Sequence, residues 1–448
     1  MSRYESLSLP EDLSTEAIQA EVERILGSEK FSRSARLRSL LKFTVSQTLQ
    51  GNANVLKEYV IGTEVLRKPE SYDPRSDSLV RVLASRLRVK LKQYYANGGS
   101  EDPLVINFPK GGYVPVFQRR EKIRAEAEKK LTARNLYSRA RFQASQLTPD
   151  ALADGVTALK ESIAADPEWP VPHVALAGVH AFQGFLGFCR PREVWPAAKA
   201  AAETALQRDE MSSEAHLYLG LAQAFYEWNW QDAAIHLGKA IERDSYSGGA
   251  YLWRALAYWI PTDRLSQAEE DIQRTRELAP SPFLEEACAL ALYLCGQHET
   301  LISRTEDLEG AGRSASWLGW LRSLSLAATG EPAAALKLLG RLAETNPSDA
   351  KLAPALGCIY AQAGQHDKAR AILTSLKDRK TPSYYHALIH AALGNRNDAI
   401  LHLQESLKER EPWALYLNAD PRLASLKSAS HFVSLVRRIV PDQQSASA

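Results

Sequence analysis

The chain has 448 residues, of which 45% are hydrophobic and 24% charged, which is ordinary usage for a globular protein, and its net charge is +2. No apolar run approaches the roughly 20 residues that a membrane helix needs, and residues 1–10 lack the basic-then-apolar layout of a signal peptide. These observations exclude a helical membrane protein and predict a soluble, cytoplasmic protein with more than one domain.

The charge is unevenly distributed along the chain. Between Lys30 and Arg120 there are 17 lysines and arginines but only 7 aspartates and glutamates, so this segment carries +10. Because the whole chain carries +2, the remainder carries −8. A basic module attached to a mildly acidic body predicts a polyanionic partner for one domain only.

The N-terminal segment is predicted to begin with helices. Ser14 or Thr15 can cap a first helix that ends at Gly27. A second helix is predicted over residues 34–49, and helical spacing recurs over residues 55–66. The outside of the second helix is basic, with Arg33, Arg36, Arg38 and Lys42.

Residues 77–95 predict a basic amphipathic helix that Ser76 or Asp77 can cap. At about 100° per residue, its apolar side chains form one inward stripe of Val80, Leu83, Ala84, Leu87 and Leu91. The two flanks of the stripe are basic, with Arg86 and Lys90 on one side and Arg81, Arg88 and Lys92 on the other. Such charges are also typical of the solvated face of an ordinary helix, so the segment that follows decides between the two interpretations.

Two short β-prone runs follow this helix, Leu104 to Phe108 and Tyr113 to Phe117. They are joined through Pro109-Lys110-Gly111-Gly112, where glycine allows a positive φ, so they predict a β-hairpin. A basic helix followed by a hairpin is the order in which a winged helix-turn-helix module holds a helix in the major groove and a wing beside it.

Four short stretches in this region carry a family resemblance: Val80, Ser85-Arg86-Leu87-Arg88-Val89-Lys90-Leu91, Asp102-Pro103 and Gly112-Tyr113. With them, residues 37–117 resemble the OmpR/PhoB-type winged helix-turn-helix domain of bacterial transcription regulators. The resemblance implies that Arg86 and its neighbours face bases and that Arg88 and Lys110 lie near phosphates or the minor groove. The residues expected to bind double-stranded DNA are Ser78, Leu79, Arg81, Val82, Arg86, Arg88, Lys90, Lys92 and Lys110.

The remaining two-thirds of the chain contain an internal repeat. Small residues recur at a nearly constant interval, since Ala198, Ala233 and Ala268 are 35 apart and Ala335 and Ala369 are 34 apart. A period of about 34 residues, with small side chains where two antiparallel helices cross, is typical of tetratricopeptide repeats. We predict eight repeats, anchored at Gly155, Ala198, Ala233, Ala268, Leu301, Ala335, Ala369 and Ala399.

Two further stretches, Tyr226 to Ala233 and Glu411 to Phe432, resemble the repeat domains attached to bacterial winged-helix regulators, adenylate cyclases and kinases. The predicted fold class is therefore mainly α, with an N-terminal winged helix-turn-helix that has a small β wing, followed by an α-solenoid of tetratricopeptide repeats. The expected domains are 1–117 for the winged helix, 118–134 for a charged helical linker, 135–440 for the solenoid and 441–448 for a disordered tail.

Several features that resemble catalytic or metal sites are better explained by packing. The cysteines, Cys189, Cys288, Cys295 and Cys358, have no metal-type spacing and fall in apolar helical stretches. His386 and His390 are four apart but have no third ligand nearby in sequence, so we expect no metal. No phosphate-binding loop and no nucleophile elbow occur. We therefore expect no enzyme activity and no cofactor.

The sequence leaves two hypotheses for function. In the first, the chain is a transcription regulator that binds double-stranded DNA through residues 30–117, while the repeats bind a protein or peptide or mediate homo-oligomer formation. In the second, the chain is a scaffold whose basic N-terminal domain binds protein instead of DNA. Arg86, Arg88 and Lys110 favour the first hypothesis, and the apolar Leu79 and Leu83 favour the second.

Overall fold

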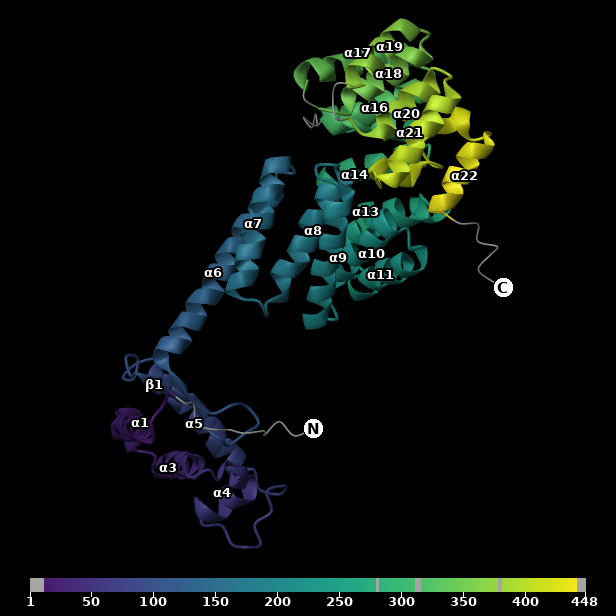
Figure 1. The fold of residues 1–448 in the computed structure, drawn as a ribbon. Coiled ribbons are helices and arrows are strands. Elements are labelled where there is room, and N and C mark those ends of the chain that lie inside the picture. The colour runs from purple at the N-terminus through teal and green to yellow at the C-terminus, as the bar shows by residue number, and fades with distance from the viewer. Residues whose placement is uncertain (1–11, 279–281, 311–315, 348, 378–380, 441–448) are drawn as a thin grey trace. The chain divides into compact units, whose positions relative to one another are not determined.

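The computed structural model describes residues 12–278, 282–310, 316–347, 349–377 and 381–440. These residues are mainly α-helical and contain one sheet of two strands (Figure 1). The mainly α fold class predicted from the sequence is thus confirmed. The chain divides into two compact units, Met1–Thr132 and Ala133–Ala448. The tail predicted at 441–448 lies outside the described residues.

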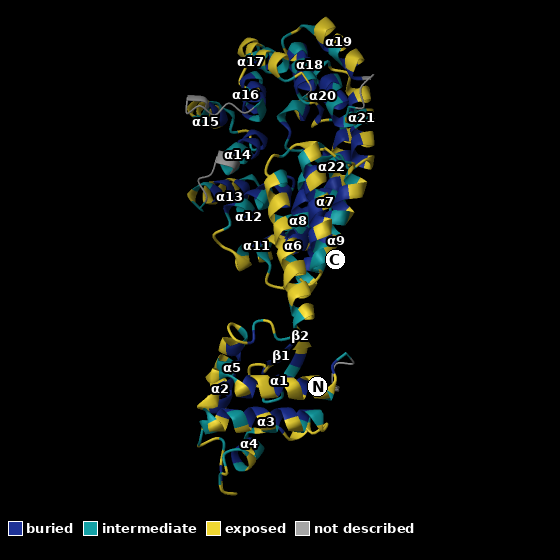
Figure 2. Ribbon diagram, turned by 90° about the vertical axis from the view of Figure 1, so that its left-hand side faces the viewer, coloured by how far each residue is buried: buried dark blue, intermediate teal, exposed yellow. Residues whose placement is uncertain are grey.

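The N-terminal unit begins with helices and is followed by a hairpin. Its elements are α1 (Thr15–Gly27), α2 (Glu29–Ser32), α3 (Ala35–Leu49), the 3-10 turn η1 (Ala53–Val55), α4 (Glu58–Glu64), α5 (Leu79–Tyr95), β1 (Leu104–Asn107) and β2 (Val116–Arg119). A predicted cap begins α1, because the Ser14 side chain accepts a hydrogen bond of 3.2 Å from the Ala17 backbone N–H. Figure 2 shows buried and exposed residues alternating along α1 and α3, as in helices that pack one face on a core.

The core of this unit forms around α5. The predicted inward stripe is buried at every position: Val80, Leu83, Ala84, Leu87 and Leu91. Apart from Ala84, the stripe packs in one apolar cluster with Ile18 of α1, Leu40 of α3 and Ile106 of β1. Because the stripe is fixed against this core, the opposite face of α5 is directed to solvent.

The hairpin differs from the prediction in its second strand. β1 and β2 pair antiparallel, from Leu104 opposite Arg119 to Asn107 opposite Val116. The second strand therefore begins at Val116 and not at Tyr113. The physical reason is Pro115, which has no backbone N–H to donate to the ladder. We refer to residues 104–119 as the wing.

The charged segment predicted as a linker continues into the first repeat helix. Its first two residues, Gln118 and Arg119, belong to β2, and the rest belongs with the first repeat helix to α6 (Arg120–Ala144), which begins in the N-terminal unit and ends in the second unit. Most of its side chains are exposed (Figure 2), but Ala133 and Ala140 are buried. The Ser162 hydroxyl donates a buried hydrogen bond of 2.7 Å to the Ala133 carbonyl, so the C-terminal half of α6 is joined to the next helix.

The second unit consists of helix pairs, which follow one another from blue through teal and green to yellow-green in Figure 1. After α6 come α7 (Pro149–Ala165), α8 (Pro170–Phe185), α9 (Pro191–Arg208), α10 (Ser213–Ala222), α11 (Trp230–Arg243), α12 (Gly248–Arg254), α13 (Leu265–Leu278), α14 (Pro282–Leu294), α15 (His298–Gly310), α16 (Ser316–Ala328), α17 (Pro332–Thr345), α18 (Leu352–Gln362), α19 (His366–Lys377), α20 (Ser383–Ala392) and α21 (Arg396–Lys408). Single π-helical turns, η2 (Gln223–Glu227) and η3 (Ala255–Trp259), extend α10 and α12. The chain then forms η4 (Pro412–Tyr416), η5 (Pro421–Leu426) and α22 (Ser430–Ile439).

The predicted repeat anchors all occupy equivalent places. Each lies on the second helix of a pair and each is buried: Gly155, Ala198, Ala233, Ala268, Leu301, Ala335, Ala369 and Ala399. The first helices also use small residues at close contacts. A Cβ atom on Gly220 of α10 would lie 2.8 Å from Leu237 Cγ and 3.2 Å from its backbone N in α11. Small residues therefore set the spacing of the paired helices, as tetratricopeptide repeats require.

The first helices form one side of this unit. They contact the first helices of the neighbouring pairs in a continuous row: α8, α10, α12, α14, α16, α18 and α20. Within the described ranges, second helices of neighbouring pairs do not approach each other as closely. Elements on the concave side of a curved stack lie closer together, so we refer to the side formed by the first helices as the inner face.

Candidate nucleic-acid interface

The nine residues predicted to bind DNA lie on the outer side of α5 and on the wing. Ser78, Arg81, Val82, Arg86, Lys92 and Lys110 are exposed, and Leu79, Arg88 and Lys90 are half-buried. The exposed face of α5 also contains Ser85, Val89 and Gln93. On α5, Val82, Ser85, Val89 and Gln93 lie opposite the buried stripe, and the basic residues lie on its two flanks.

Arg88 connects α5 to the turn of the wing. Its Nε donates a hydrogen bond of 3.0 Å to the Phe108 carbonyl, and its Nη2 donates to the carbonyls of Pro109 at 3.0 Å and Gly112 at 2.7 Å. The guanidinium thus replaces the ladder hydrogen bonds that are missing where Pro115 interrupts the second strand. In this structure Arg88 positions the wing, and its donors are directed to protein carbonyls.

Arg81 is also engaged within the unit. Its Nε lies 3.1 Å from Glu58 Oε1, and its Nη2 donates a hydrogen bond of 2.9 Å to the Pro74 carbonyl. The N-cap residue of α5 is Ser78, not Ser76 or Asp77 as predicted, but Asp77 lies one residue earlier and accepts a hydrogen bond of 2.9 Å from the Leu79 backbone N–H. The hydrogen bond from the Lys68 ammonium lowers the pKa of Asp77 below its usual value, so this carboxylate is charged at neutral pH.

A hollow of about 650 Å³ lies between the beginning of α3 and the outer face of α5. We refer to it as the α3–α5 hollow. It is lined by Arg33, Ser34, Ala35, Arg36, Leu37, Leu66, Leu79, Val82, Leu83, Ser85, Arg86, Val89, Lys90 and Gln93. The lining contains four cationic side chains and no acidic one.

The four cations of the α3–α5 hollow are Arg33, Arg36, Arg86 and Lys90. No hydrogen bond or ion pair joins their side chains to another of the residues that the structure describes. The N-terminal end of α3 adds backbone N–H groups and the positive end of the helix dipole to the same place. The hollow is therefore a concentrated positive surface that is suited to an anion.

The sequence-based site omitted part of this surface. Arg33 and Arg36 were expected on a basic outer face of their helix, but nothing in a single sequence brings them beside Arg86 and Lys90. Ser85 and Val89 were likewise omitted, although the period of the buried stripe places them on the outer face.

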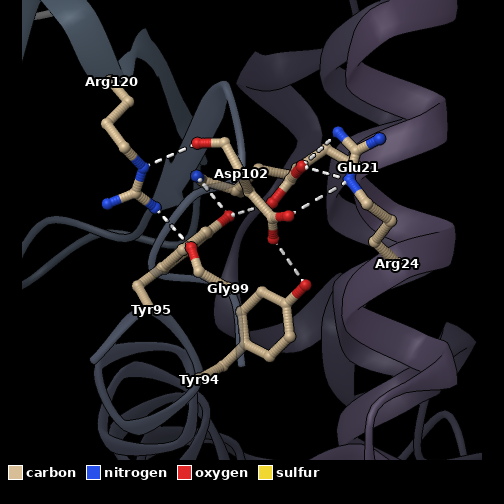
Figure 3. Close-up of polar contacts among 8 residues, drawn as sticks. Glu21, Arg24, Tyr94, Tyr95, Gly99, Asp102 and Arg120 are labelled. Atoms are coloured by element: carbon tan, nitrogen blue, oxygen red, sulfur yellow. Dashed lines mark hydrogen bonds and ion pairs between the residues drawn. The ribbon is translucent and has the colours of Figure 1, made fainter. Parts of the chain in front are cut away.

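A polar cluster holds α5 and the start of α6 against α1 (Figure 3). The Glu21 carboxylate of α1 is fully buried and accepts hydrogen bonds of 2.9 Å from Arg24 Nε and 3.0 Å from the Tyr95 hydroxyl. The Tyr95 hydroxyl in turn accepts a hydrogen bond of 2.9 Å from the Ile106 backbone N–H of β1. Burial raises the pKa of Glu21 above its usual value, although the hydrogen bonds from Arg24 and Tyr95 oppose the shift.

Asp102 is at the centre of the second part of this cluster. Its carboxylate accepts a hydrogen bond of 2.6 Å from the Tyr94 hydroxyl and lies 3.6 Å from Arg24 Nε. Arg120, the first residue of α6, donates hydrogen bonds of 2.6 Å to the carbonyls of Asp102 and Gly99. Gly99 is required because a Cβ atom there would clash with the Tyr94 ring. The cluster thus fixes the C-terminal end of α5 to the unit.

The two histidines set aside in the sequence pack against a third histidine. His386 and His390 both stack on His402, with ring centroids 5.1 and 5.4 Å apart. Among the described residues, no group of three histidine, cysteine or acidic side chains is arranged to hold a metal ion. Likewise, none of the helices in those ranges is long and apolar enough to cross a membrane.

Comparison with known families identifies the type of repeat. Residues 326–393 match a family described as Tetratricopeptide repeat. These residues contain α17, α18, α19 and α20, including the predicted anchors Ala335 and Ala369. The chain therefore contains tetratricopeptide repeats in this part of its second unit. Comparison with curated protein sequences gives no match.

Several solved structures are similar to this chain at low identity. A tetratricopeptide repeat protein from Parabacteroides merdae is 13% identical, the match covers 65% of this chain and 99% of that chain, and the TM-score is 0.30. The human IFIT1 dimer with PPP-AAAA is 15% identical, the match covers 97% of this chain and 92% of that chain, and the TM-score is 0.40. Yeast Tom70 is 14% identical, the match covers 95% of this chain and 89% of that chain, and the TM-score is 0.39. At these identities and TM-scores, the similarity supports no shared partner or activity.

Proposed function

We propose that the chain is a DNA-binding transcription regulator whose N-terminal unit binds duplex DNA and whose tetratricopeptide repeats bind a regulatory protein or peptide. The observation that carries the proposal is the α3–α5 hollow, where Arg33, Arg36, Arg86 and Lys90 face solvent without an acidic residue in the lining. Cations in this arrangement release condensed counterions when they bind phosphates, which is the main source of affinity for DNA. The basic segment between Lys30 and Arg120 supports the same partner.

The outer face of α5 has the features of a helix that enters a major groove. Its central exposed positions, Ser78, Val82, Ser85 and Val89, are small or apolar, so the helix backbone can approach base edges closely. Valine methyl groups suit the thymine methyl group, and an arginine such as Arg86 at the edge of this face suits guanine. Basic side chains on both flanks, including Lys90 and Lys92, are placed for phosphates in this proposal.

The wing has a defined role in the proposed complex. Arg88 holds the turn through three carbonyls, and Lys110 is exposed on that turn beside Gly111, whose φ is 81°. A fixed turn presents the Lys110 ammonium to the DNA backbone at lower entropic cost than a free loop. We therefore assign Lys110 to phosphate contact and Arg88 to positioning of the wing, within the winged helix-turn-helix arrangement that the sequence resembles.

The proposal is tested by a gel-shift experiment with the full chain and pooled genomic duplex fragments at two salt concentrations. We expect retarded complexes that weaken steeply as salt rises, because the contacts are mainly to phosphates. Lys110→Ala is expected to weaken all duplexes alike, whereas Arg86→Ala is expected to cost about 1–3 kcal/mol on the preferred site and to flatten sequence preference. Absence of any complex at low salt would contradict the proposal.

A second candidate function is favoured by one observation. Val82 and Val89 are 42% and 53% exposed in the middle of the α5 face, and exposed apolar side chains of this kind are also found on protein-binding helices. In this alternative, the chain is a scaffold whose N-terminal unit binds a protein. Binding would then depend strongly on Val82 and Val89, weakly on salt, and would not be inhibited by duplex DNA.

A further inference from the structure

A cavity of about 310 Å³ lies on the inner face of the repeat domain. Its walls come from α14, α16 and α18, which are neighbours in the row of first helices, from the first residue of α15, His298, and from η5. Ala327 and Ala328 of α16 are small, so they leave space that larger side chains would fill. A volume of this size, which we call the inner cavity, suits a small organic molecule.

Arg422 of η5 contributes a charged donor to the lining of the inner cavity. Its side chain is only 6% exposed, and its Nε and Nη2 donate hydrogen bonds of 2.9 and 2.7 Å to the fully buried Asp420. The guanidinium also lies over the Trp413 ring, at 5.2 Å from its centroid. None of these contacts uses Nη1, which has no hydrogen-bond partner among the described residues. A fixed guanidinium with one unpaired nitrogen is a pre-organised donor for a ligand.

The carboxylate that pairs with Arg422 is already engaged by several donors. Asp420 accepts further hydrogen bonds of 2.9 Å from the Tyr384 hydroxyl and 3.0 Å from the Arg422 backbone N–H. Asp420 does not line the inner cavity, and none of the described residues that line it is acidic. The lining therefore contains a cation but no carboxylate that would repel an anionic ligand.

Two further polar groups belong to the lining. The Tyr293 hydroxyl lies 3.5 Å from Asp420 Oδ1, which is long for a hydrogen bond, so its proton is available to a ligand. Burial raises the pKa of Tyr293 well above its usual value, so this hydroxyl keeps its proton at neutral pH. The His298 ring contacts Ser325 Oγ through Nδ1 at 3.2 Å, which leaves Nε2 without a hydrogen-bond partner among the described residues.

The rest of the inner wall is mainly apolar and includes Leu324, Ala327, Cys358 and Ile359. Burial raises the pKa of the Cys358 thiol to about 12, so this side chain is uncharged and acts as a small hydrophobic group. Apolar walls with a few convergent polar groups are typical of small-molecule sites. The inner cavity is thus suited to a ligand with a short apolar body and one group that accepts hydrogen bonds.

We propose that the inner cavity binds a small organic acid, with its carboxylate on Arg422 and its alkyl part against Leu324 and Ile359. A carboxylate is favoured over an uncharged carbonyl because its full charge attracts the guanidinium at a place where water screens the attraction only weakly. The bound acid contacts three first helices and η5 at once, so it joins the repeats to the segment that follows them. This inference does not depend on DNA binding by the N-terminal unit.

The test measures binding of butyrate to the full chain by saturation-transfer NMR, with butyramide as an uncharged ligand of nearly equal size. We expect butyrate to bind at least about tenfold more tightly than butyramide, which corresponds to the loss of one hydrogen bond between charged groups. Ala328 is an exposed residue of the lining, so Ala328→Phe should obstruct the inner cavity without altering the ion pair, and butyrate binding should be lost. Ala334→Phe is the matched control, because Ala334 is exposed on α17 outside the lining, and this variant should bind butyrate as wild type does.

The ligand and Ala328 are varied instead of Arg422, because removal of Arg422 would leave the buried Asp420 without its charged partner and destabilise the fold. Equal affinities for butyrate and butyramide would overturn the assignment of a carboxylate to Arg422. Unchanged butyrate binding by Ala328→Phe would show that the acid binds elsewhere. Absence of butyrate binding by the wild-type chain would also overturn the proposal.

Discussion

Replacing Arg88 by methionine tests whether this residue holds the wing. The guanidinium donates to three carbonyls, at 3.0, 3.0 and 2.7 Å. A buried hydrogen bond from a charged donor contributes about 1.5–3 kcal/mol to stability. Here the contact to Pro109 is exposed and the other two are partly buried, so water can hydrogen-bond to the carbonyls after the substitution and offset much of the lost stability. We expect Arg88→Met to weaken local stability of the wing by about 1–2 kcal/mol.

The assay is hydrogen exchange of the wing amides in the full chain. A loss of that size corresponds to exchange that is about 5–30 times faster in β1 and β2. Arg88→Lys is expected to behave like Arg88→Met, because an ammonium cannot reproduce the forked geometry, whereas at a simple phosphate contact lysine retains most of the function. Lys92→Met removes one exposed charge from the same helix and serves as control. If the wing amides exchange at the same rate in the Arg88→Met and Lys92→Met chains, Arg88 does not position the wing.

Three further predictions concern packing and pH. Ala369→Leu is expected to destabilise the repeat domain by about 1–3 kcal/mol in urea unfolding, because Ala369 is fully buried at a helix crossing. Ala371 lies on the exposed side of α19, so Ala371→Leu should leave stability unchanged. Equal effects of the two substitutions would show that Ala369 does not lie at a crossing. Gly220→Ala should also destabilise the repeat domain, because the added Cβ meets Leu237. Gly340 has open space around it, so Gly340→Ala should stabilise its helix by about 0.5–1 kcal/mol. Thermal unfolding in which both variants change stability in the same direction would count against this packing. Because burial raises the pKa of Glu21, folding favours its protonated form, and this contribution to stability is complete below the unfolded pKa of about 4.3 and is lost as pH rises through the folded pKa. The free energy of unfolding of Glu21→Gln should therefore rise relative to that of wild type as pH rises. A difference that stays constant with pH would contradict the shift.

Features with a local period were predictable from the sequence. The stripe of α5 follows the helical repeat, so the burial of Val80, Leu87 and Leu91 could be predicted without knowing what packs against them. The anchors of the repeats follow a second period, and even Leu301, which is large at a position of small residues, proved to be buried in the expected place.

Features that depend on contacts between distant residues were not predictable. The hydrogen bond from Trp230 to Ile439 joins residues 209 apart, and no spacing in the sequence indicates it. Arg88 illustrates a second limit, since an arginine suits a phosphate and a carbonyl cluster equally, and only the position of the wing turn distinguishes them. The α3–α5 hollow has the same origin, because Arg36 and Arg86 belong to separate helices.

The most direct test of the central proposal is the salt dependence of duplex DNA binding by the full chain, measured by fluorescence anisotropy. The double variant Arg36→Ala/Arg86→Ala removes two cations of the α3–α5 hollow, and Lys42→Ala/Arg124→Ala removes two cations that are ion-paired with Glu23 and Glu101 at 3.1 Å. If the hollow binds DNA phosphates, the first variant should lower the slope of log affinity against log salt by about 2, while the control keeps the wild-type slope. The same slope in all three proteins, or no binding by wild type at low salt, would contradict the proposal.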